Sequence, residues 1–175
     1  MKLLKFSFIF FVISLSSFAK DNSLNLQYAG EIGKYSVGVG HRWSTWFYQA
    51  FHYGVVPKSE SITKIETYAL KNNFAFYDFE YNNFFTDFYV GLTAYYVPGS
   101  KYETDDLDST PNGYYRQSSY RIILALGFEV VYDSLYALYF EAGVNDVWLI
   151  NYYNNDSIEI EDHVSLALGF RWINF

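Results

Sequence analysis

The chain has 175 residues, a formal net charge of −7, no cysteine and 23% aromatic residues, including 19 tyrosines and 17 phenylalanines. The acidic balance argues against nucleic acid as a partner, because nucleic-acid binding needs a basic surface. Without cysteine there is no disulfide framework, and three histidines are too few to suggest a zinc site. No cofactor is expected.

The first 19 residues have the pattern of a secretory signal peptide. Residues 1–5 are short and basic, residues 6–19 carry no charge, and Ser17 and Ala19 place small side chains at the two positions that determine cleavage. The uncharged run is about 14 residues long, whereas a membrane-spanning helix needs about 20. We therefore expect cleavage after Ala19 and one mature domain over residues 20–175.

Eight segments alternate between two kinds of side chain with the period of a β-strand. The segment over residues 62–71 fits either parity, and the aromatic stretch 72–83 could extend a strand or form a packed connection. Polar loops are expected over residues 55–61, 98–117 and 154–161. In chain order, the predicted strands are 23–29, 34–43, 46–54, 62–71, 84–97, 118–132, 135–152 and 163–175.

The last strand shows the content of its two faces most clearly. Leu166, Leu168 and Phe170 lie on one face, and Gly169 and Arg171 lie on the other. An eight-stranded lumen is only just wide enough for side chains, so small and charged residues suit the inside and large apolar residues suit lipid. The pattern predicts an all-β, eight-stranded antiparallel up-and-down transmembrane β-barrel.

Both termini of such a barrel would lie in the periplasm. The connections 30–33, 55–61, 98–117 and 154–161 would then be external, and the connections 44–45, 72–83 and 133–134 would be periplasmic. Outer-membrane barrels have short periplasmic turns and longer external loops. Two of the three periplasmic connections agree, and the stretch 72–83 is the exception.

The same parity places charged residues of both signs inside the barrel, where paired side chains should fill the lumen and leave at most a small porin-like leak. The network is expected to centre on its members in the last three strands. With the opposite parity each arginine would face lipid, at a cost of about 2–4 kcal/mol near the midplane. The predicted network comprises Arg42, Asp87, Arg121, Glu129, Glu141 and Arg171, joined by Lys64 and Glu66 if the strand over residues 62–71 takes the preferred parity.

Together, the export signal, the eight alternating segments, the long outer loops and the final Phe175 resemble the small eight-stranded outer-membrane barrels of Gram-negative bacteria, of the OmpA-domain and OmpX kind. The resemblance implies an outer-membrane location, contact with membrane lipid and lipopolysaccharide, and assembly by periplasmic chaperones and the barrel-assembly machinery. Because Phe170 and Trp172 are out of step with Phe175, the chain must bend near residues 173–174. The implied assembly signal comprises Gly169, Phe170, Trp172, Ile173 and Phe175.

Some small barrels of this class are lipid A deacylases or acyltransferases that use a histidine with a serine and a carboxylate. The candidate pair here is His41 with Ser44. The expected topology puts Ser44 at a periplasmic turn, away from the outer leaflet, and the deacylases' His-x-Ser spacing is absent. A lipid A-modifying enzyme is therefore an alternative to the main hypothesis and not the main hypothesis itself.

A second alternative is a soluble, lipocalin-like periplasmic carrier, with the large apolar residues lining an internal cup. In the outer loop, Glu103, Asp105, Asp106 and Asp108 could bind Ca²⁺ or Mg²⁺. No spacing matches a calcium loop, so solvated loop charges are the simpler interpretation. We expect a non-enzymatic outer-membrane barrel that contributes to envelope integrity or presents acidic external loops to a partner.

Overall fold

The computed structural model describes residues 22–61, 64–98, 120–154 and 164–174. The predicted signal peptide, the acidic cluster at residues 103–108, His163 and Phe175 lie outside these residues.

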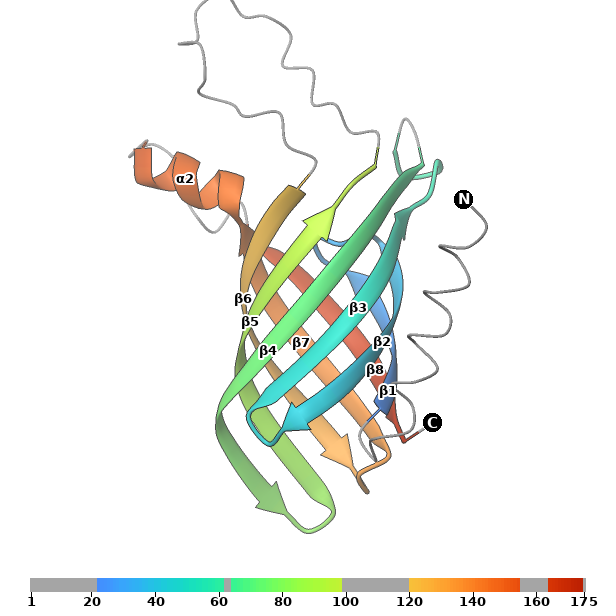
Figure 1. The fold of residues 1–175 in the computed structure, drawn as a ribbon, viewed down its shortest axis with the longest axis vertical. Helices are drawn as coiled ribbons and strands as arrows, with labels where there is room; N and C mark the ends of the chain where they lie inside the picture. The colour runs from blue at the N-terminus through green and yellow to red at the C-terminus, as the bar shows by residue number, and fades with distance from the viewer. Residues whose placement is uncertain (1–21, 62–63, 99–119, 155–163, 175) are drawn as a thin grey trace, which may run out of the picture.

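Eight antiparallel strands form one closed barrel in which each strand pairs with the next along the chain, and the first pairs with the last (Figure 1). The predicted up-and-down barrel is confirmed. The strands are β1 (Asn22–Ala29), β2 (Tyr35–Ser44), β3 (Phe47–Val56), β4 (Ile65–Tyr81), β5 (Phe84–Tyr96), β6 (Tyr120–Tyr132), β7 (Tyr136–Asn145) and β8 (Ser165–Ile173).

The aromatic stretch 72–83 belongs to β4, which continues to Tyr81 and turns at Asn82–Asn83 into β5. Asn82 has a φ of 54° and can adopt this left-handed conformation at small cost. Asp133 and Ser134 both have positive φ, as in the type I′ turns that suit tight hairpins. The three connections at this end of the barrel are therefore short, at residues 45–46, 82–83 and 133–135. We call it the turn end and the opposite end the loop end.

The predicted strand over residues 135–152 is wrong in its second half. β7 ends at Asn145, and the helix α2 (Asp146–Asn154) follows at the loop end (Figure 1). The Asn145 side-chain oxygen accepts a hydrogen bond from the Trp148 backbone N–H at 3.2 Å, which caps the first turn of the helix. No helix among the described residues is long and apolar enough to cross a membrane.

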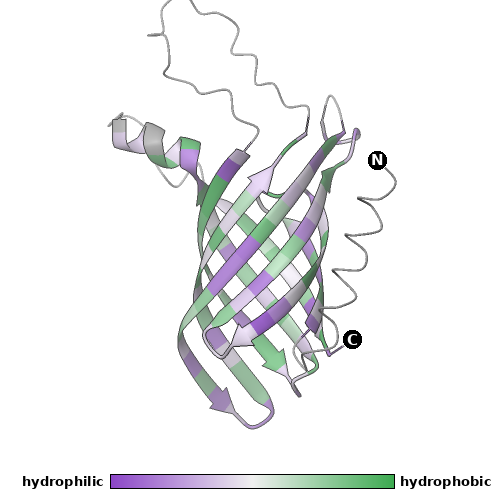
Figure 2. Cartoon of the chain, in the orientation of Figure 1, coloured by the Kyte–Doolittle hydropathy of each residue, from purple (hydrophilic) through white to green (hydrophobic). Residues whose placement is uncertain are grey.

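The two faces of the sheet differ sharply in chemistry, and Figure 2 shows the alternation of hydrophobic and hydrophilic residues along the strands. Leu126 and Leu138 on the outside are 62% and 59% exposed, whereas Asp87 and Arg171 inside are 1% and 3% exposed. We call the outward-facing surface of the strands the outer wall. Its large apolar side chains surround an interior of small, polar and charged residues.

Candidate functional site

Four strands contribute to a charged cluster inside the barrel near the turn end. Arg42 of β2 donates one hydrogen bond to Asp87 of β5 at 2.9 Å and another to Glu129 of β6. Arg171 of β8 donates to the second carboxylate oxygen of Glu129 at 2.5 Å. Glu129 is thus shared by two guanidinium groups. We call these four residues the arginine layer.

Neighbouring polar groups fix the guanidinium of Arg171 in place. Its Nε donates to Asn25 Oδ1 at 3.0 Å, and its central carbon lies 3.6 Å from the ring centroid of Tyr48. The Tyr48 hydroxyl donates to the same Asn25 oxygen at 3.0 Å and lies 2.8 Å from Ser23 Oγ. Cation–π contact and charge-assisted hydrogen bonds together compensate for the burial of this cation.

A second set of interior side chains lies nearer the middle of the barrel. We call it the lysine layer; it comprises Gln27, Lys71, Tyr89, Tyr139 and Glu141. Lys71 Nζ donates to Glu141 at 2.5 Å and to Gln27 at 2.8 Å. The Tyr89 hydroxyl donates to the other oxygen of Glu141 at 2.9 Å, and the Tyr139 hydroxyl donates to Gln27 at 3.2 Å. The arginine and lysine layers together hold three cations and three anions, so the formal charges balance.

An apolar cluster closes the barrel toward the loop end. Ile32 in the β1–β2 connection is only 2% exposed and packs into this end of the lumen. Buried side chains from β4, β5 and β6, with Val97 just beyond β5, surround it. The apolar cluster comprises Ile32, Ala69, Tyr95, Val97, Ile123 and Ala125.

Little empty space remains between these layers. A cavity of about 10 Å³ is bordered by the arginine layer, and one of about 20 Å³ is bordered by Lys71, Glu141 and Ile32. Asn73 and Asp87 line the smaller cavity, and each has one buried oxygen without a protein partner. Such a setting suits about one bound water molecule and is far too small for an organic ligand.

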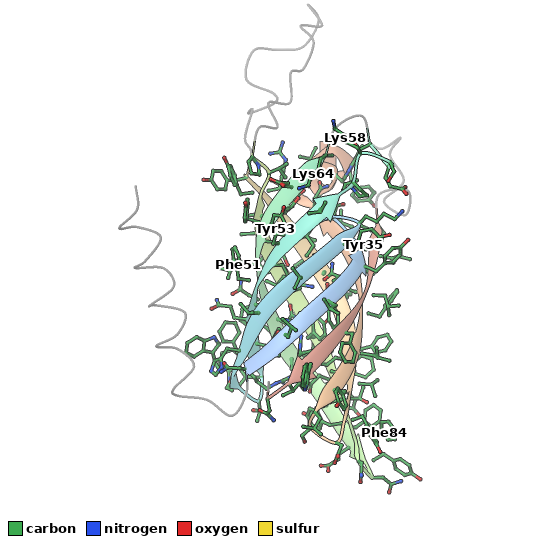
Figure 3. The ribbon with its side chains drawn as sticks, turned by 90° about the vertical axis from the view of Figure 1, so that its right-hand side faces the viewer. Tyr35, Phe51, Tyr53, Lys58, Lys64 and Phe84 are labelled. Atoms are coloured by element: carbon green, nitrogen blue, oxygen red, sulfur yellow. The ribbon has the colours of Figure 1, made fainter. Side chains whose placement is uncertain are left out.

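The prediction that Lys64 and Glu66 face the lumen is wrong. Lys64 Nζ donates to Glu66 Oε1 at 2.5 Å, and the Tyr53 hydroxyl donates to the same oxygen at 2.8 Å; the Lys64 and Glu66 side chains are 51% and 39% exposed. Figure 3 shows Lys64 and Tyr53 toward the loop end. The opposite residues of β4 face inward, so Lys71 is the cation that this strand contributes to the lumen. The neighbouring carboxylate raises the pKa of Lys64.

Arg121 shares the inward parity of β6 but does not join the predicted network. It lies half-buried at the loop end of β6, at the opposite end of the strand from Glu129, and donates to the Tyr120 carbonyl at 3.2 Å. The expected centre in the last three strands is therefore incomplete. Glu129 and Arg171 do pair. Two cations come from earlier strands, however: Arg42 binds Glu129, and Lys71 binds Glu141, across the narrow lumen.

The candidate pair His41 and Ser44 does not form among the described residues. His41 Nδ1 lies 3.1 Å from Asn22 Oδ1, and its ring packs edge-on against Trp43 at 4.7 Å. Ser44 Oγ is buried without a hydrogen-bond partner. On the outer wall, His41 is instead in register with Gln49, which donates to Asn72 at 2.8 Å.

Sequence reasoning missed a histidine–serine contact inside the barrel. His52 Nδ1 lies 3.2 Å from Ser36 Oγ, and His52 is only 1% exposed. β3 carries large aromatic side chains on both faces, so its residue pattern does not direct His52 inward. Ser36 and His52 are both buried inside the barrel and separated from its outer wall by the sheet.

The residues of the implied assembly signal fall on both faces of β8. Phe170 and Trp172 lie on the outer wall, whereas Gly169 lies inside beneath the ring of Tyr139. β8 ends at Ile173, and Asn174 has a φ of 60° while its N–H donates to the Asn22 carbonyl at 2.8 Å. The bend predicted near residues 173–174 is confirmed at Asn174.

Two aromatic bands border the outer wall. Near the loop end, Tyr53, Tyr68, Tyr96 and Tyr120 are in register across β3–β6. Nearer the turn end, the rings of Phe47 and Phe74 stack at 5.1 Å and Trp46 packs on Phe74 at 6.2 Å. Such bands are typical of membrane barrels at the two interfaces with water.

No family model matches the sequence, and no curated protein matches it either. The crystal structure of the outer membrane enzyme PagL is similar, with a TM-score of 0.51 and 11% identity over 87% of this chain and 98% of that chain. A de novo designed transmembrane β-barrel has a TM-score of 0.49 and 11% identity over 89% of this chain and 97% of that chain. At such low identity, the likeness to PagL shows a shared barrel fold.

Among the described residues, no three histidine, aspartate or glutamate side chains are grouped so that they could hold a metal ion. The acidic loop candidates Glu103, Asp105, Asp106 and Asp108 lie outside the described residues. A metal site there stays a prediction.

Proposed function

We propose that the protein is an integral outer-membrane β-barrel with a sealed lumen. In this proposal it acts without catalysis, by contributing to envelope integrity or by presenting its loop end to a partner outside the cell. The observation that carries the proposal is the inverted distribution of side chains, with charges buried inside and large apolar groups exposed on the outer wall.

Water would be a poor solvent for this surface. Soluble monomers rarely expose a large contiguous apolar patch, yet here every strand presents exposed large hydrophobic residues to the outside. In lipid the same surface is favourable, and a closed barrel also satisfies the backbone hydrogen bonds that hydrocarbon cannot. The buried ion pairs are then removed from lipid and from bulk water alike.

The lengths of the connections support an orientation. The turn end has short turns, as periplasmic ends of outer-membrane barrels do, and the loop end has the longer connections. We therefore place the turn end in the periplasm and the loop end outside the cell.

The soluble-carrier alternative requires an apolar internal cup. The described lumen instead contains two charged layers, and the two cavities that border them measure about 10 and 20 Å³, whereas small-molecule sites occupy about 300–1,000 Å³. The enzyme alternative is not favoured by the geometry of His41, whose imidazole is bonded to Asn22 rather than to Ser44.

Cell fractionation combined with gel electrophoresis tests the proposal. We expect the expressed protein in the outer-membrane fraction, extractable only with detergent, and we expect an unboiled sample to migrate differently from a boiled one because the closed barrel resists detergent. Release in soluble form by osmotic shock would contradict the proposal. Unchanged lipid A mass on expression is expected, and a mass shift would favour the enzyme alternative.

A further inference from the structure

The hairpin of β4 and β5 continues beyond its neighbour at the turn end. The first residue of β3, Phe47, pairs with Phe74, so residues 76–81 of β4 have β5 on one side and no described strand on the other. Figure 1 shows this hairpin as the part of the sheet that projects farthest at the turn end. We call residues 76–81 and 84–88 the hairpin extension.

The outer face of the hairpin extension is aromatic. Tyr77, Phe79 and Tyr81 alternate along β4, with Phe84 and Phe88 opposite them on β5. Tyr81 is 70% exposed, and the rings of Tyr77 and Phe88 lie 6.0 Å apart. Figure 3 shows Phe84 at this end of the molecule.

This aromatic face is continuous with the outer wall. Phe84 is in register with Tyr132 of β6, which is in register with Tyr136 of β7, and Tyr136 is in register with Trp172 of β8. The rings of Phe84 and Tyr132 lie 5.1 Å apart. An unbroken aromatic row therefore joins the hairpin extension to the wall that we place in lipid.

The inner face of the same segment is acidic. Asp78 and Glu80 point to this face, in register with Asp87 and Phe85, and both carboxylates belong to exposed residues. The hairpin extension is thus amphipathic across the thickness of the sheet. An apolar environment suits one face and water suits the other.

The open edge of β4 limits how deep the segment can lie. Its free backbone N–H and C=O groups cannot enter hydrocarbon without losing hydrogen bonds that water would otherwise supply. The aromatic rings favour leaving water, and aromatic residues concentrate where one end is apolar and the other wet. The headgroup layer of a bilayer provides both water for the open edge of β4 and apolar contact for the aromatic rings.

A protein strand added to this edge is less well supported. The register shifts between Ala75 and Tyr77, and such a bulge disrupts the ladder that a partner strand would extend. Exposed Asp78 and Glu80 on the edge strand also oppose pairing.

We propose that the hairpin extension lies in the headgroup layer of the periplasmic leaflet, with its aromatic face against phospholipid and Asp78 and Glu80 facing water. This inference rests on the membrane placement proposed above. It makes the hairpin a lipid-binding anchor whose β4 strand reaches past the first residue of β3 at the turn end.

Because the chain has no cysteine, single nitroxide labels can be placed cleanly. The experiment uses Phe79→Cys on the aromatic face, Asp78→Cys as the adjacent control on the acidic face, and Leu138→Cys on the outer wall of β7. Each labelled protein is folded into phosphatidylethanolamine–phosphatidylglycerol vesicles and checked by its heat-dependent gel shift. Accessibility is then measured by electron paramagnetic resonance with oxygen, which concentrates in lipid, and a water-soluble nickel chelate.

We expect the ratio of oxygen to nickel accessibility to be severalfold higher at position 79 than at position 78, and highest at position 138. If position 79 matches position 78 while position 138 stays in lipid, the inference is overturned and the membrane barrel stands. Nickel access at positions 79 and 138 alike would overturn the membrane placement as well. Shielding of position 79 from both reagents would overturn the inference in favour of contact with a second copy of this chain, the only other protein in the vesicles.

Discussion

Glu129 holds together two arginines that come from different strands. One of its oxygens accepts from Arg42 and the other from Arg171, and the carboxylate is almost completely buried. A buried ion pair adds little stability compared with apolar packing, but the loss of one partner leaves an uncompensated buried charge. The arginine layer should therefore be sensitive to loss of this one anion.

We expect Glu129→Gln to lower the free energy of unfolding by about 3–5 kcal/mol, the usual cost of breaking a buried pair from one side. Glutamine keeps nearly the same volume, so the effect reports charge rather than packing. Urea-induced unfolding of the protein in lipid vesicles, followed by tryptophan fluorescence, measures the change.

The same substitution at Glu66 is the matched control. Glu66 also binds a cation, Lys64, but the Lys64 and Glu66 side chains are 51% and 39% exposed, and solvent-exposed pairs contribute little. We expect Glu66→Gln to leave unfolding nearly unchanged. Equal destabilisation by the two variants would show that the arginine layer has no special role.

The contrast between Lys71 and Lys64 shows what residue patterns can and cannot predict. Arg42, Asp87, Glu129, Glu141 and Arg171 lie in strands with clear alternation, and the structure places all of them inside. Over residues 62–71 alone, either parity fits the pattern. When these residues are taken as part of the longer β4, Tyr68, Leu70 and Phe74 lie on the outward face and Lys71 lies on the inward face. The sequence does not show this continuity, because the aromatic stretch 72–83 fits a strand or a connection equally well.

At the scale of the strands, interior tyrosines are matched by glycines on their neighbours. Tyr139 of β7 is in register with Gly169 of β8, and Tyr89 of β5 is in register with Gly127 of β6. A Cβ at Gly169 would lie 1.9 Å from the Tyr139 ring, and a Cβ at Gly127 would lie 2.5 Å from the Tyr89 ring. Because the two glycines have no side chain, the Tyr139 and Tyr89 rings can lie against the sheet, where their hydroxyls bond Gln27 and Glu141.

We expect Gly169→Ala to destabilise the barrel by about 1–3 kcal/mol, the typical cost of overpacking. The added methyl group must displace the Tyr139 ring and its hydrogen bond to Gln27. The temperature at which the folded band disappears in a heated gel series measures the effect. Gly91→Ala is the control, because its Cβ would meet its nearest neighbours at an ordinary 3.4 Å; a larger loss there than at Gly169 would contradict the packing argument.

The junction of β7 and α2 shows why the extent of one element was mispredicted. Apolar and aromatic residues continue past Asn145, and alternation alone cannot distinguish a strand from a short helix of the same composition. The deciding feature is local, since the Asn145 side chain caps the first turn and Asp146 adds a negative charge there. The Asn145-Asp146 pair, at the end of a ten-residue strand, is the sequence feature that marks this boundary.

At the scale of the whole molecule, three successive barriers lie along the barrel axis. The arginine layer, the lysine layer and the apolar cluster each come from several strands, and two cavities that border them measure about 10 and 20 Å³. Ions would have to cross paired charges and then an apolar constriction. The barrel should therefore conduct poorly even though its interior is polar.

We expect no stable current steps from the native protein in planar lipid bilayers, with a conducting porin as the positive control. The double variant Lys71→Ser, Glu141→Ser removes one ion pair without changing the net charge of the lumen. It should also remain closed, because the other two barriers persist. Stable channels from the native chain would refute the filled lumen, and channels from the double variant alone would show that the lysine layer is its only seal.

The pairing of Arg42 with Glu129 also constrains how the molecule can be built. These two residues are 87 positions apart along the chain, so an incomplete sheet inserting one hairpin at a time would carry a lone guanidinium into the bilayer. Neutralisation becomes available only when distant strands come together in three dimensions. If the barrel spans the outer membrane as proposed, the pairing of these charges favours closure of the sheet at the membrane surface before the strands enter the bilayer.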